Sequence, residues 1–178
     1  DLGLNEAGLR VAVSQDMDKW CIETMRRNSH LAIDGDIRDL IESDPSCEFF
    51  LQASGVTREA LFAVVGGPPC QPFSTAGKRK GVEDARGQLY QEFIKVVSAL
   101  RPRFFIMENV KGLASMPCDP ADKQSKPVLD TILESFKAIG YHTVHGILDA
   151  VHYGTPQFRE RLVIVGSRDG EDVFLPAP

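Results

Sequence analysis

The sequence has 178 residues, of which 43% are hydrophobic and 25% are charged, and its formal net charge is −5. This composition is typical of a folded globular domain, and no apolar run approaches the roughly 18 residues that a membrane-spanning helix needs. A net acidic chain argues against a uniformly basic nucleic-acid-binding protein, so any DNA or RNA contact must come from local clusters of Lys and Arg.

Apolar runs and amphipathic segments alternate along the chain. In chain order they predict a strand at residues 10–14, a helix at 19–28, a weak apolar segment at 31–33, a strand at 61–65, a helix at 89–100, a strand at 103–107, a helix at 128–139, and strands at 142–148 and 161–165. This alternation indicates an α/β, Rossmann-like fold: a doubly wound, mostly parallel sheet with helices on both faces. Ligands of such sheets bind at the carboxyl ends of the strands.

The four cysteines are scattered, at positions 21, 47, 70 and 118, and no two form a Cys-x-x-Cys pair. We therefore expect no zinc site and no other metal site. The first residues lack a basic stretch followed by an apolar one, so no secretory leader is expected. Scattered cysteines in an α/β chain are typical of a reduced, cytoplasmic protein.

The strongest chemical signal is Gly-Gly-Pro-Pro-Cys-Gln-Pro-Phe-Ser at residues 66–74, directly after a predicted strand. Proline fixes φ, and glycine permits a sharp turn and the close approach of a ligand. Cys70 is therefore a candidate nucleophile, provided that its thiol ionises readily. The alternative is a buried, inert cysteine in a proline-rich turn.

Two further polar elements stand near predicted strands. Glu108 and Asn109 follow the strand at 103–107, where a carboxyl group can act as a proton donor. Arg159 and Arg161 alternate along an extended segment, so both side chains should point to one face and could hold a phosphate, a carboxylate or a base carbonyl. Taken singly, each element is better explained structurally: Glu108 as a cap of the next helix or a partner of a basic surface residue, and the two arginines as surface ion pairs on a strand edge.

Together, Pro-Cys-Gln-Pro-Phe-Ser at 69–74, Glu-Asn-Val at 108–110 and Gln-x-Arg-x-Arg at 157–161 resemble the motifs of the cytosine-C5 DNA methyltransferase family. The resemblance extends from about residue 1 to residue 166. It implies that Cys70 adds to C6 of cytosine, after which C5 takes a methyl group from S-adenosylmethionine. It also implies that Glu108, at least partly protonated, contacts N3 and the exocyclic amine, and that Arg161 reaches O2. Asn109 would hold the Pro-Cys loop, and Arg159 would support that loop or a phosphate.

The resemblance also implies a cofactor site. Asp16 would bind the ribose hydroxyls, Met17 and Ile37 would pack on the adenine, and Asp36 would accept a hydrogen bond from its exocyclic amine. Pro69 and Leu89 resemble further walls of this pocket. Asp18 is expected instead to cap the helix that follows it.

The implied partner is double-stranded DNA, with the target cytosine rotated out of the duplex. The basic, glycine-containing segment at 74–81 suits a lid that closes on DNA, or else is a solvated loop without a partner. Residues 1–178 read as one catalytic domain that lacks the family's opening glycine-rich loop and its downstream target-recognition region. We therefore expect weak cofactor binding by this chain alone, which micromolar binding in isothermal titration would contradict.

Three functions remain open at this point. The first is a bacterial DNA methyltransferase of a restriction-modification system, and the second is a tRNA cytosine-C5 methyltransferase, whose branch often has Thr where Ser74 stands. The third is a catalytically incomplete scaffold. Two unrelated cysteine chemistries fare worse, because a phosphatase loop would need Arg in place of Ala76 and a cysteine protease would need a partner histidine in a recognisable context.

Overall fold

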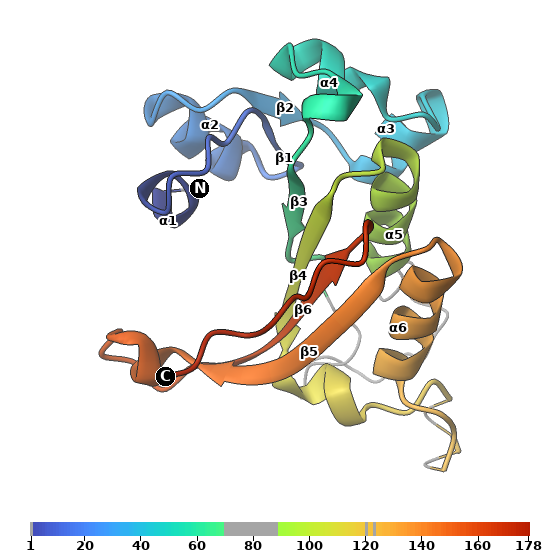
Figure 1. Cartoon of the computed structure of the whole chain (residues 1–178). Helices are drawn as coiled ribbons and strands as arrows, with labels where there is room; N and C mark the ends of the chain where they lie inside the picture. Colours follow the sequence, from blue (N-terminus) through green and yellow to red (C-terminus); the bar gives the residue numbers. More distant parts are fainter. Residues whose placement is uncertain (1, 70–88, 120, 123) are drawn as a thin grey trace. The chain divides into compact units, whose positions relative to one another are not determined.

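The protein is described from a computed structural model, which covers residues 2–69, 89–119, 121–122 and 124–178 (Figure 1). The chain divides into two compact units, Asp1–Leu61 and Phe62–Pro178. Within the described ranges, no helix combines the length and the apolar character needed to cross a bilayer.

The first unit is built on two short parallel strands, β1 (Ser14–Asp16) and β2 (Ala32–Asp34), joined by helix α2 (Lys19–Arg27). The Asp18 carboxylate accepts hydrogen bonds from the backbone N–H groups of Trp20 and Cys21, which confirms its predicted capping role. The other elements are α1 (Leu2–Glu6), α3 (Ile37–Ser43), α4 (Glu48–Ser54) and the 3-10 turn η1 (Arg58–Ala60).

Two details of the first unit differ from the sequence prediction. The first strand was expected at residues 10–14, but the ladder begins at Ser14, which lies opposite Ala32. The apolar residues just before Ser14 suggested a buried strand, whereas strand pairing sets its true bounds. Helices α3 and α4 were not predicted, because each has only seven residues and shows too little periodicity to identify.

The second unit contains a four-stranded sheet in the order β3-β4-β6-β5. Its strands are β3 (Ala63–Gly66), β4 (Phe104–Val110), β5 (His142–Asp149) and β6 (Glu160–Ser167). The α/β class is therefore confirmed. The sheet is mixed, however: β3 and β4 are parallel, whereas β6 runs antiparallel to both β4 and β5. The link from β5 to β6 contains only the 3-10 turn η3 (Ala150–Tyr153), and so short a link favours an antiparallel return.

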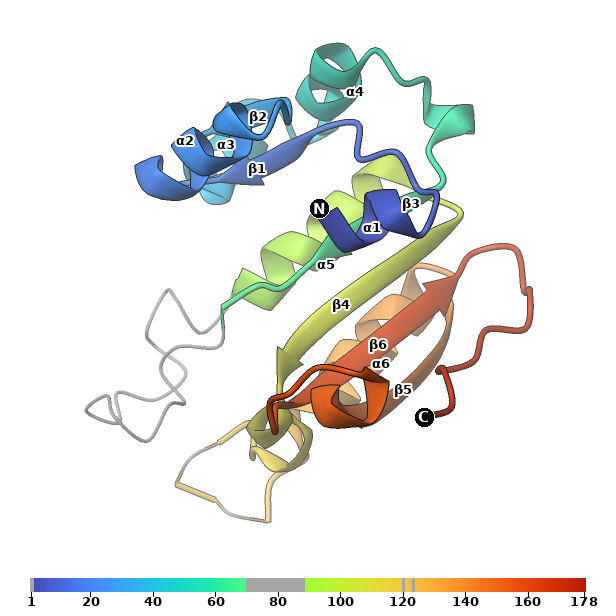
Figure 2. The ribbon, with the colours of Figure 1, turned by 90° about the vertical axis from the view of Figure 1, so that its left-hand side faces the viewer.

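Helices α5 (Leu89–Leu100) and α6 (Val128–Ala138) lie on the same face of this sheet, as both ribbon views show (Figures 1 and 2). Both helices were predicted from their apolar spacing, and both are confirmed. The core between helices and sheet is aromatic: Phe105 of β4 stacks on Phe136 of α6 with ring centroids 3.9 Å apart, and Phe93 of α5 meets both edge-on. The 3-10 turn η2 (Lys111–Ser115) follows β4 and adds the buried Leu113.

Candidate functional site

The candidate active site begins where β3 ends. Gly67 and the prolines at 68–69 follow the last strand residue. Asn109 of β4 is 5% exposed, and its Nδ2 donates a hydrogen bond to the carbonyl oxygen of Pro68 at 2.9 Å. This bond ties the start of the Pro-Cys segment to the neighbouring strand. Cys70 itself lies outside the described residues, so its role as nucleophile stays a prediction.

Glu108 and Asn109 lie inside β4, whereas the sequence placed them just after a strand. The prediction ended the strand at the first polar residue, but the ladder with β6 continues to Val110, opposite Arg161. Side chains alternate along a strand. Asn109 therefore shares the helix-covered face with the buried Met107, and Glu108 points to the opposite face.

Glu108 and Arg161 form an ion pair on that opposite face. The Arg161 Nε lies 2.7 Å from Oε1 of Glu108, and the side chains are 25% and 45% exposed respectively. A Cβ added to Gly67 would stand 3.2 Å from the other carboxylate oxygen, so the Pro-Cys segment passes directly beside this group. The structure thus brings Glu108, Asn109 and Arg161 together with the segment that leads into Cys70.

Arg159 stands one residue before β6 begins and is exposed. Its backbone N–H donates to Oδ1 of Asp149 at 2.8 Å, and no described residue pairs with its guanidinium. Arg161 differs, because it is the second residue of a strand paired on both sides. The sequence predicted that the two arginines act on one face, and this stays a prediction for Arg159.

Two predicted cofactor residues lie at the ends of neighbouring strands in the first unit. Asp16 ends β1, and Asp36 comes two residues after β2. The backbone N–H of Gly35 donates to the carbonyl oxygen of Asp16 at 3.2 Å, and the Gln15 side chain donates to the carbonyl oxygen of Gly35 at 2.5 Å. Gly35 has a φ of 146°, which residues with a side chain rarely adopt. Both carboxylates therefore stand at the carboxyl ends of parallel strands, where such sheets bind ligands.

Arg38 holds the carboxylate of Asp36 in place. Both its backbone N–H and its Nε donate to Oδ1, at 2.9 and 3.0 Å, and its terminal nitrogen pairs with Oδ2. These hydrogen bonds lower the pKa of Asp36 below its ordinary value, chiefly through the Arg38 side chain. Asp36 is therefore a fixed, ionised acceptor, as a contact to an amino group requires.

The remaining predicted cofactor residues are apolar. Met17 is 63% exposed, directly after β1, and Ile37 opens α3 beside Asp36. Both Pro69, the residue before Cys70, and Leu89, the first residue of α5, belong to the second unit. A common pocket for all these residues stays a prediction.

Comparison with known proteins decides the family. A family model described as C-5 cytosine-specific DNA methylase matches residues 1–177. The chain belongs to this family. Among curated relatives of the methylase, the Type II methyltransferase M.AquIA of Picosynechococcus sp. is 38% identical over all of this chain and 71% of its own length. The Type II methyltransferase M.NgoFVII of Neisseria gonorrhoeae is 35% identical, and this chain spans 44% of it.

Two solved structures of longer proteins share the fold of this chain. A DNA modification methyltransferase encoded within an E. coli prophage matches with a TM-score of 0.72 and 26% identity, over 95% of this chain and 43% of that one. The S. pombe Dnmt2 methyltransferase matches with a TM-score of 0.67 over 96% of this chain and 48% of its own, at 22% identity, which supports the fold alone. The methylase chain thus spans less than half of either solved relative.

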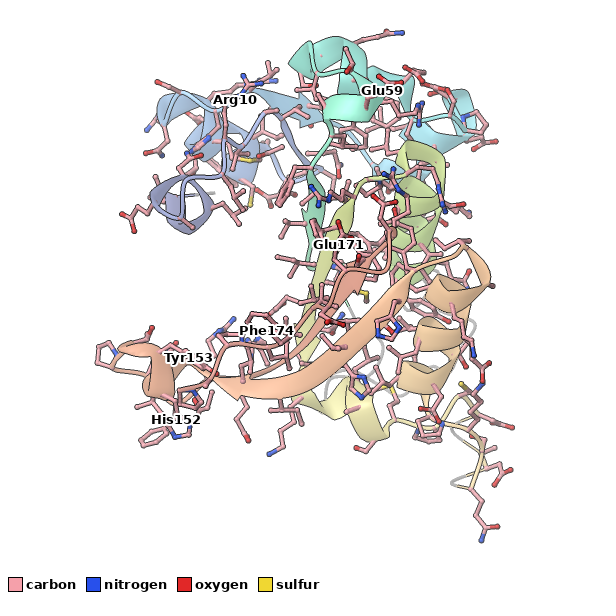
Figure 3. All side chains as sticks on the ribbon, viewed as in Figure 1. Arg10, Glu59, His152, Tyr153, Glu171 and Phe174 are labelled. Carbon is pink, nitrogen blue, oxygen red and sulfur yellow. The ribbon has the colours of Figure 1, made fainter. Side chains whose placement is uncertain are left out.

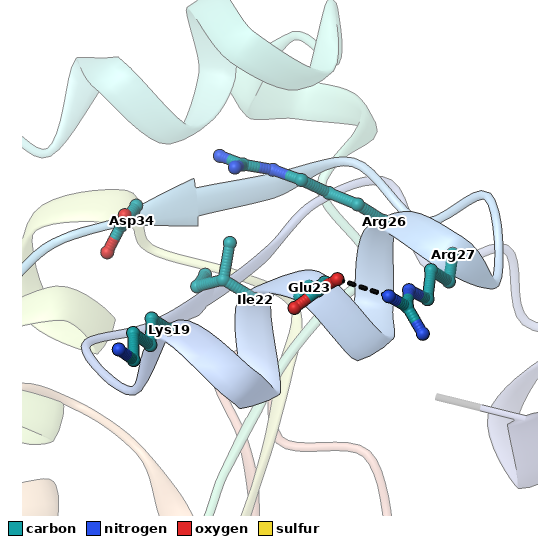
Figure 4. A pocket seen from close by; sticks show the side chains of 6 residues that line it. All are labelled: Lys19, Ile22, Glu23, Arg26, Arg27 and Asp34. Atoms are coloured by element: carbon teal, nitrogen blue, oxygen red, sulfur yellow. Dashed lines mark hydrogen bonds and ion pairs between the residues drawn. The ribbon is translucent and has the colours of Figure 1, made fainter.

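A cavity of about 390 Å³ also opens on α2 and β2, lined by five charged side chains and Ile22 (Figure 4). It contains none of the predicted site residues, and its Arg27 pairs with Glu23 on the helix surface. Among the residues that the structure describes, no cluster of His, Cys, Asp and Glu could hold a metal ion.

Sequence reasoning missed three side chains around the methylase sites. Arg38 and Asp149 hold predicted site residues through hydrogen bonds, and Lys111 pairs at 2.7 Å with Glu160, the residue before Arg161 in the chain. None belongs to a motif identified from the sequence. The only signal for Arg38 was its position two residues after Asp36, where a long side chain can fold back onto a cap.

Proposed function

We propose that the methylase transfers a methyl group from S-adenosylmethionine to C5 of cytosine in double-stranded DNA, through a temporary bond between Cys70 and C6. The observation that carries this proposal is the ion pair of Glu108 and Arg161, which lies beside Gly67 in the segment that leads to Cys70. Membership of the C-5 cytosine-specific DNA methylase family supports the substrate and the reaction.

In this proposal the Cys70 sulfur bonds to C6, and the displaced electron pair makes C5 nucleophilic. S-adenosylmethionine, when bound, supplies an electrophilic methyl group. Loss of the C5 proton then breaks the bond between Cys70 and C6 and releases the enzyme. Covalent addition is needed because the free cytosine ring is too electron-poor at C5 to attack a sulfonium.

The charged pair would recognise the cytosine edge. The Glu108 carboxyl would contact N3 and the exocyclic amine and stabilise the charge that builds on the ring, while Arg161 would donate to O2. The two groups bind each other in the structure, so an entering base exchanges this contact for contacts to its own polar atoms. The Asn109 side chain would help to position Cys70 indirectly, because it donates a hydrogen bond to the backbone carbonyl of Pro68.

The first unit fits the cofactor by the chemistry of its donor and acceptor groups. Asp16 can accept from two adjacent ribose hydroxyls, because a carboxylate has two acceptor oxygens. Asp36 can accept from an adenine amine, and exposed Met17 offers an apolar surface for the ring. Bound DNA must present its cytosine outside the duplex, because the reacting carbon cannot be reached inside it.

The test uses the full-length protein that contains this chain, with tritiated S-adenosylmethionine and unmethylated genomic DNA. We expect tritium in 5-methylcytosine after digestion to nucleosides, and a Cys70→Ser variant should lose at least about 10³-fold in rate. DNA made with 5-fluorocytosine should trap the wild type covalently, because the fluorine at C5 cannot leave as a proton.

Two outcomes would contradict the proposal. Transfer to tRNA but not to duplex DNA would make the protein an RNA methyltransferase. Absence of transfer to either acceptor, with wild-type and Cys70→Ser proteins alike in 5-fluorocytosine capture, would indicate a scaffold without catalysis.

A further inference from the structure

The link between β5 and β6 leads directly into the predicted arginine pair. It spans residues 150–159 and turns at Gly154, whose φ is 85°. Figure 3 shows His152 and Tyr153 at the far end of this link. The Tyr153 hydroxyl donates to the carbonyl oxygen of Pro176, which ties the far end of the link to the C-terminal segment.

Asp149 closes the near end of the same link. It is the last residue of β5, and its Oδ1 accepts a hydrogen bond from the backbone N–H of Arg159 at 2.8 Å. The Ala150 N–H donates in return to the carbonyl oxygen of Arg159 at 3.2 Å. The backbone of Arg159 is thus held on both its polar groups, although it lies outside the β6 ladder.

The guanidinium of Arg159 differs from the neighbouring basic groups in having no ion-pair partner among the described residues. Arg161 pairs with Glu108, and Lys111 pairs with Glu160. Arg159 is exposed, and among the described residues its guanidinium has no partner. A fixed backbone that carries an unpaired guanidinium is organised in advance for an anion, and a phosphate suits its planar fork of donors.

We infer that Asp149 is a positioning residue, which fixes the backbone of Arg159 so that its guanidinium meets a phosphate of the bound DNA. The inference rests on the proposed function, because it takes DNA as the anion. The Asp149 carboxylate would itself repel a phosphate, so any favourable effect of Asp149 on DNA binding must pass through Arg159.

Because of this repulsion, the direction in which a substitution of Asp149 changes DNA affinity distinguishes the positioning role from a simple charge effect. Removal of a negative charge near DNA should tighten binding if charge alone matters. If Asp149 acts by positioning Arg159, Asp149→Ala should instead weaken DNA binding. Asp149→Asn is the matched control, because it removes the same charge and keeps an oxygen that can accept from the Arg159 N–H.

The experiment measures kcat and KM for unmethylated genomic DNA, with the full-length protein, at several salt concentrations. Asp149→Ala should raise the KM for DNA about ten-fold and leave kcat within about two-fold, whereas Asp149→Asn, which loses the charge but keeps the hydrogen bond, should have a KM no higher than that of the wild type. The slope of log KM against log salt should fall in magnitude by about 1 in Asp149→Ala, as one phosphate contact is lost. Tyr153→Phe, which removes the other tie of the same link, should behave as wild type.

A double-mutant cycle with Arg159→Ala tests whether the effect of Asp149 on DNA binding passes through Arg159. If Asp149 acts through Arg159, the double variant should bind DNA no more weakly than Arg159→Ala alone. Fully additive effects, an unchanged KM in Asp149→Ala, or tighter binding by that variant would each overturn the inference. These outcomes are distinct from failure of the proposed function, in which the wild type itself methylates no cytosine in DNA.

Asp149→Ala could lose its fold, so a second measurement is needed that does not depend on this variant. Amide hydrogen exchange of Arg159 in the wild type reports the hydrogen bond to Asp149 directly. Protection of this amide in wild type and in Asp149→Asn supports the positioning role of Asp149. Exchange at the rate of an open loop in the wild type overturns it.

Discussion

At the scale of single residues, Gly67 shows how little space there is between the segment that leads to Cys70 and the Glu108 carboxylate. A Cβ at this position would stand 3.2 Å from the carboxylate oxygen, close enough to displace it by a few tenths of an ångström. We expect Gly67→Ala to lower kcat about three- to ten-fold with little change in stability, because catalytic groups tolerate small displacements poorly. Gly112→Ala is the control, since a Cβ there meets nothing within 4 Å. Equal rates in the two variants would show that the position of Glu108 is not critical.

Arg38 offers a second prediction, in which the effect depends on pH. Asp36 has a lowered pKa, so its contribution to stability is present at neutral pH and is lost as the pH falls through that lowered value. Arg38→Ala should therefore reduce the unfolding free energy near neutrality, by less than about 1 kcal/mol because the Arg38 side chain is 41% exposed, and the difference should vanish in acid. Urea unfolding across this pH range measures it. The same variant should bind S-adenosylmethionine several-fold more weakly, whereas Arg38→Lys should recover part of the loss.

At the scale of elements, β6 packs against β4 through a glycine. Gly166 lies opposite Phe105, and a Cβ at Gly166 would come within 2.0 Å of that ring. The ring cannot move away easily, because it stacks on Phe136 in the core. We expect Gly166→Ala to lower the unfolding free energy by about 3 kcal/mol in denaturant titration, with Gly112→Ala near wild type. A loss below about 1 kcal/mol would mean that the sheet and helices can shift together.

The same elements show what the sequence could and could not predict. Helices α5 and α6 were predictable because their apolar spacing is set by the face they bury. The antiparallel direction of β6 was not, since alternating elements are compatible with either direction and strand pairing decides between them. The motif residues Glu108, Asn109 and Arg161 were found by their order in the chain. The hydrogen bonds from Asn109 to Pro68 and from Arg159 to Asp149 join residues 41 and 10 positions apart that share no sequence motif, so only coordinates show them.

At the scale of the whole molecule, the acidic balance and the proposed DNA partner must be reconciled. The chain has 25 acidic side chains against 20 Lys and Arg. Among the described residues around the predicted site, two basic groups are matched with acids: Arg161 with Glu108, and Lys111 with Glu160. Paired charges attract a phosphate weakly, so we expect Arg159, whose guanidinium pairs with no described residue, to have a disproportionate effect on the proposed DNA binding. On the proposed function, a chain of net charge −5 would therefore contact DNA through a few positions.

The two units should also differ in stability. The first has few buried apolar side chains, Ile22, Ile41, Cys47 and Leu51, whereas the second has a continuous aromatic and aliphatic core. Local stability follows buried apolar contact, so backbone amides of the first unit should exchange with deuterium before those of α5 and α6. The predicted cofactor residues belong to both units, and binding of S-adenosylmethionine should therefore slow exchange in the first unit most.

Hydrogen exchange with mass spectrometry on the full-length protein, with and without S-adenosylmethionine, measures this difference. Asp16→Ala is the matched control, because it should abolish the cofactor effect and leave exchange in α6 unchanged. Protection confined to the second unit would contradict the assignment of Asp16 and Asp36 to the cofactor site. Protection of the first unit that persists in Asp16→Ala would show that the cofactor is held there by other groups.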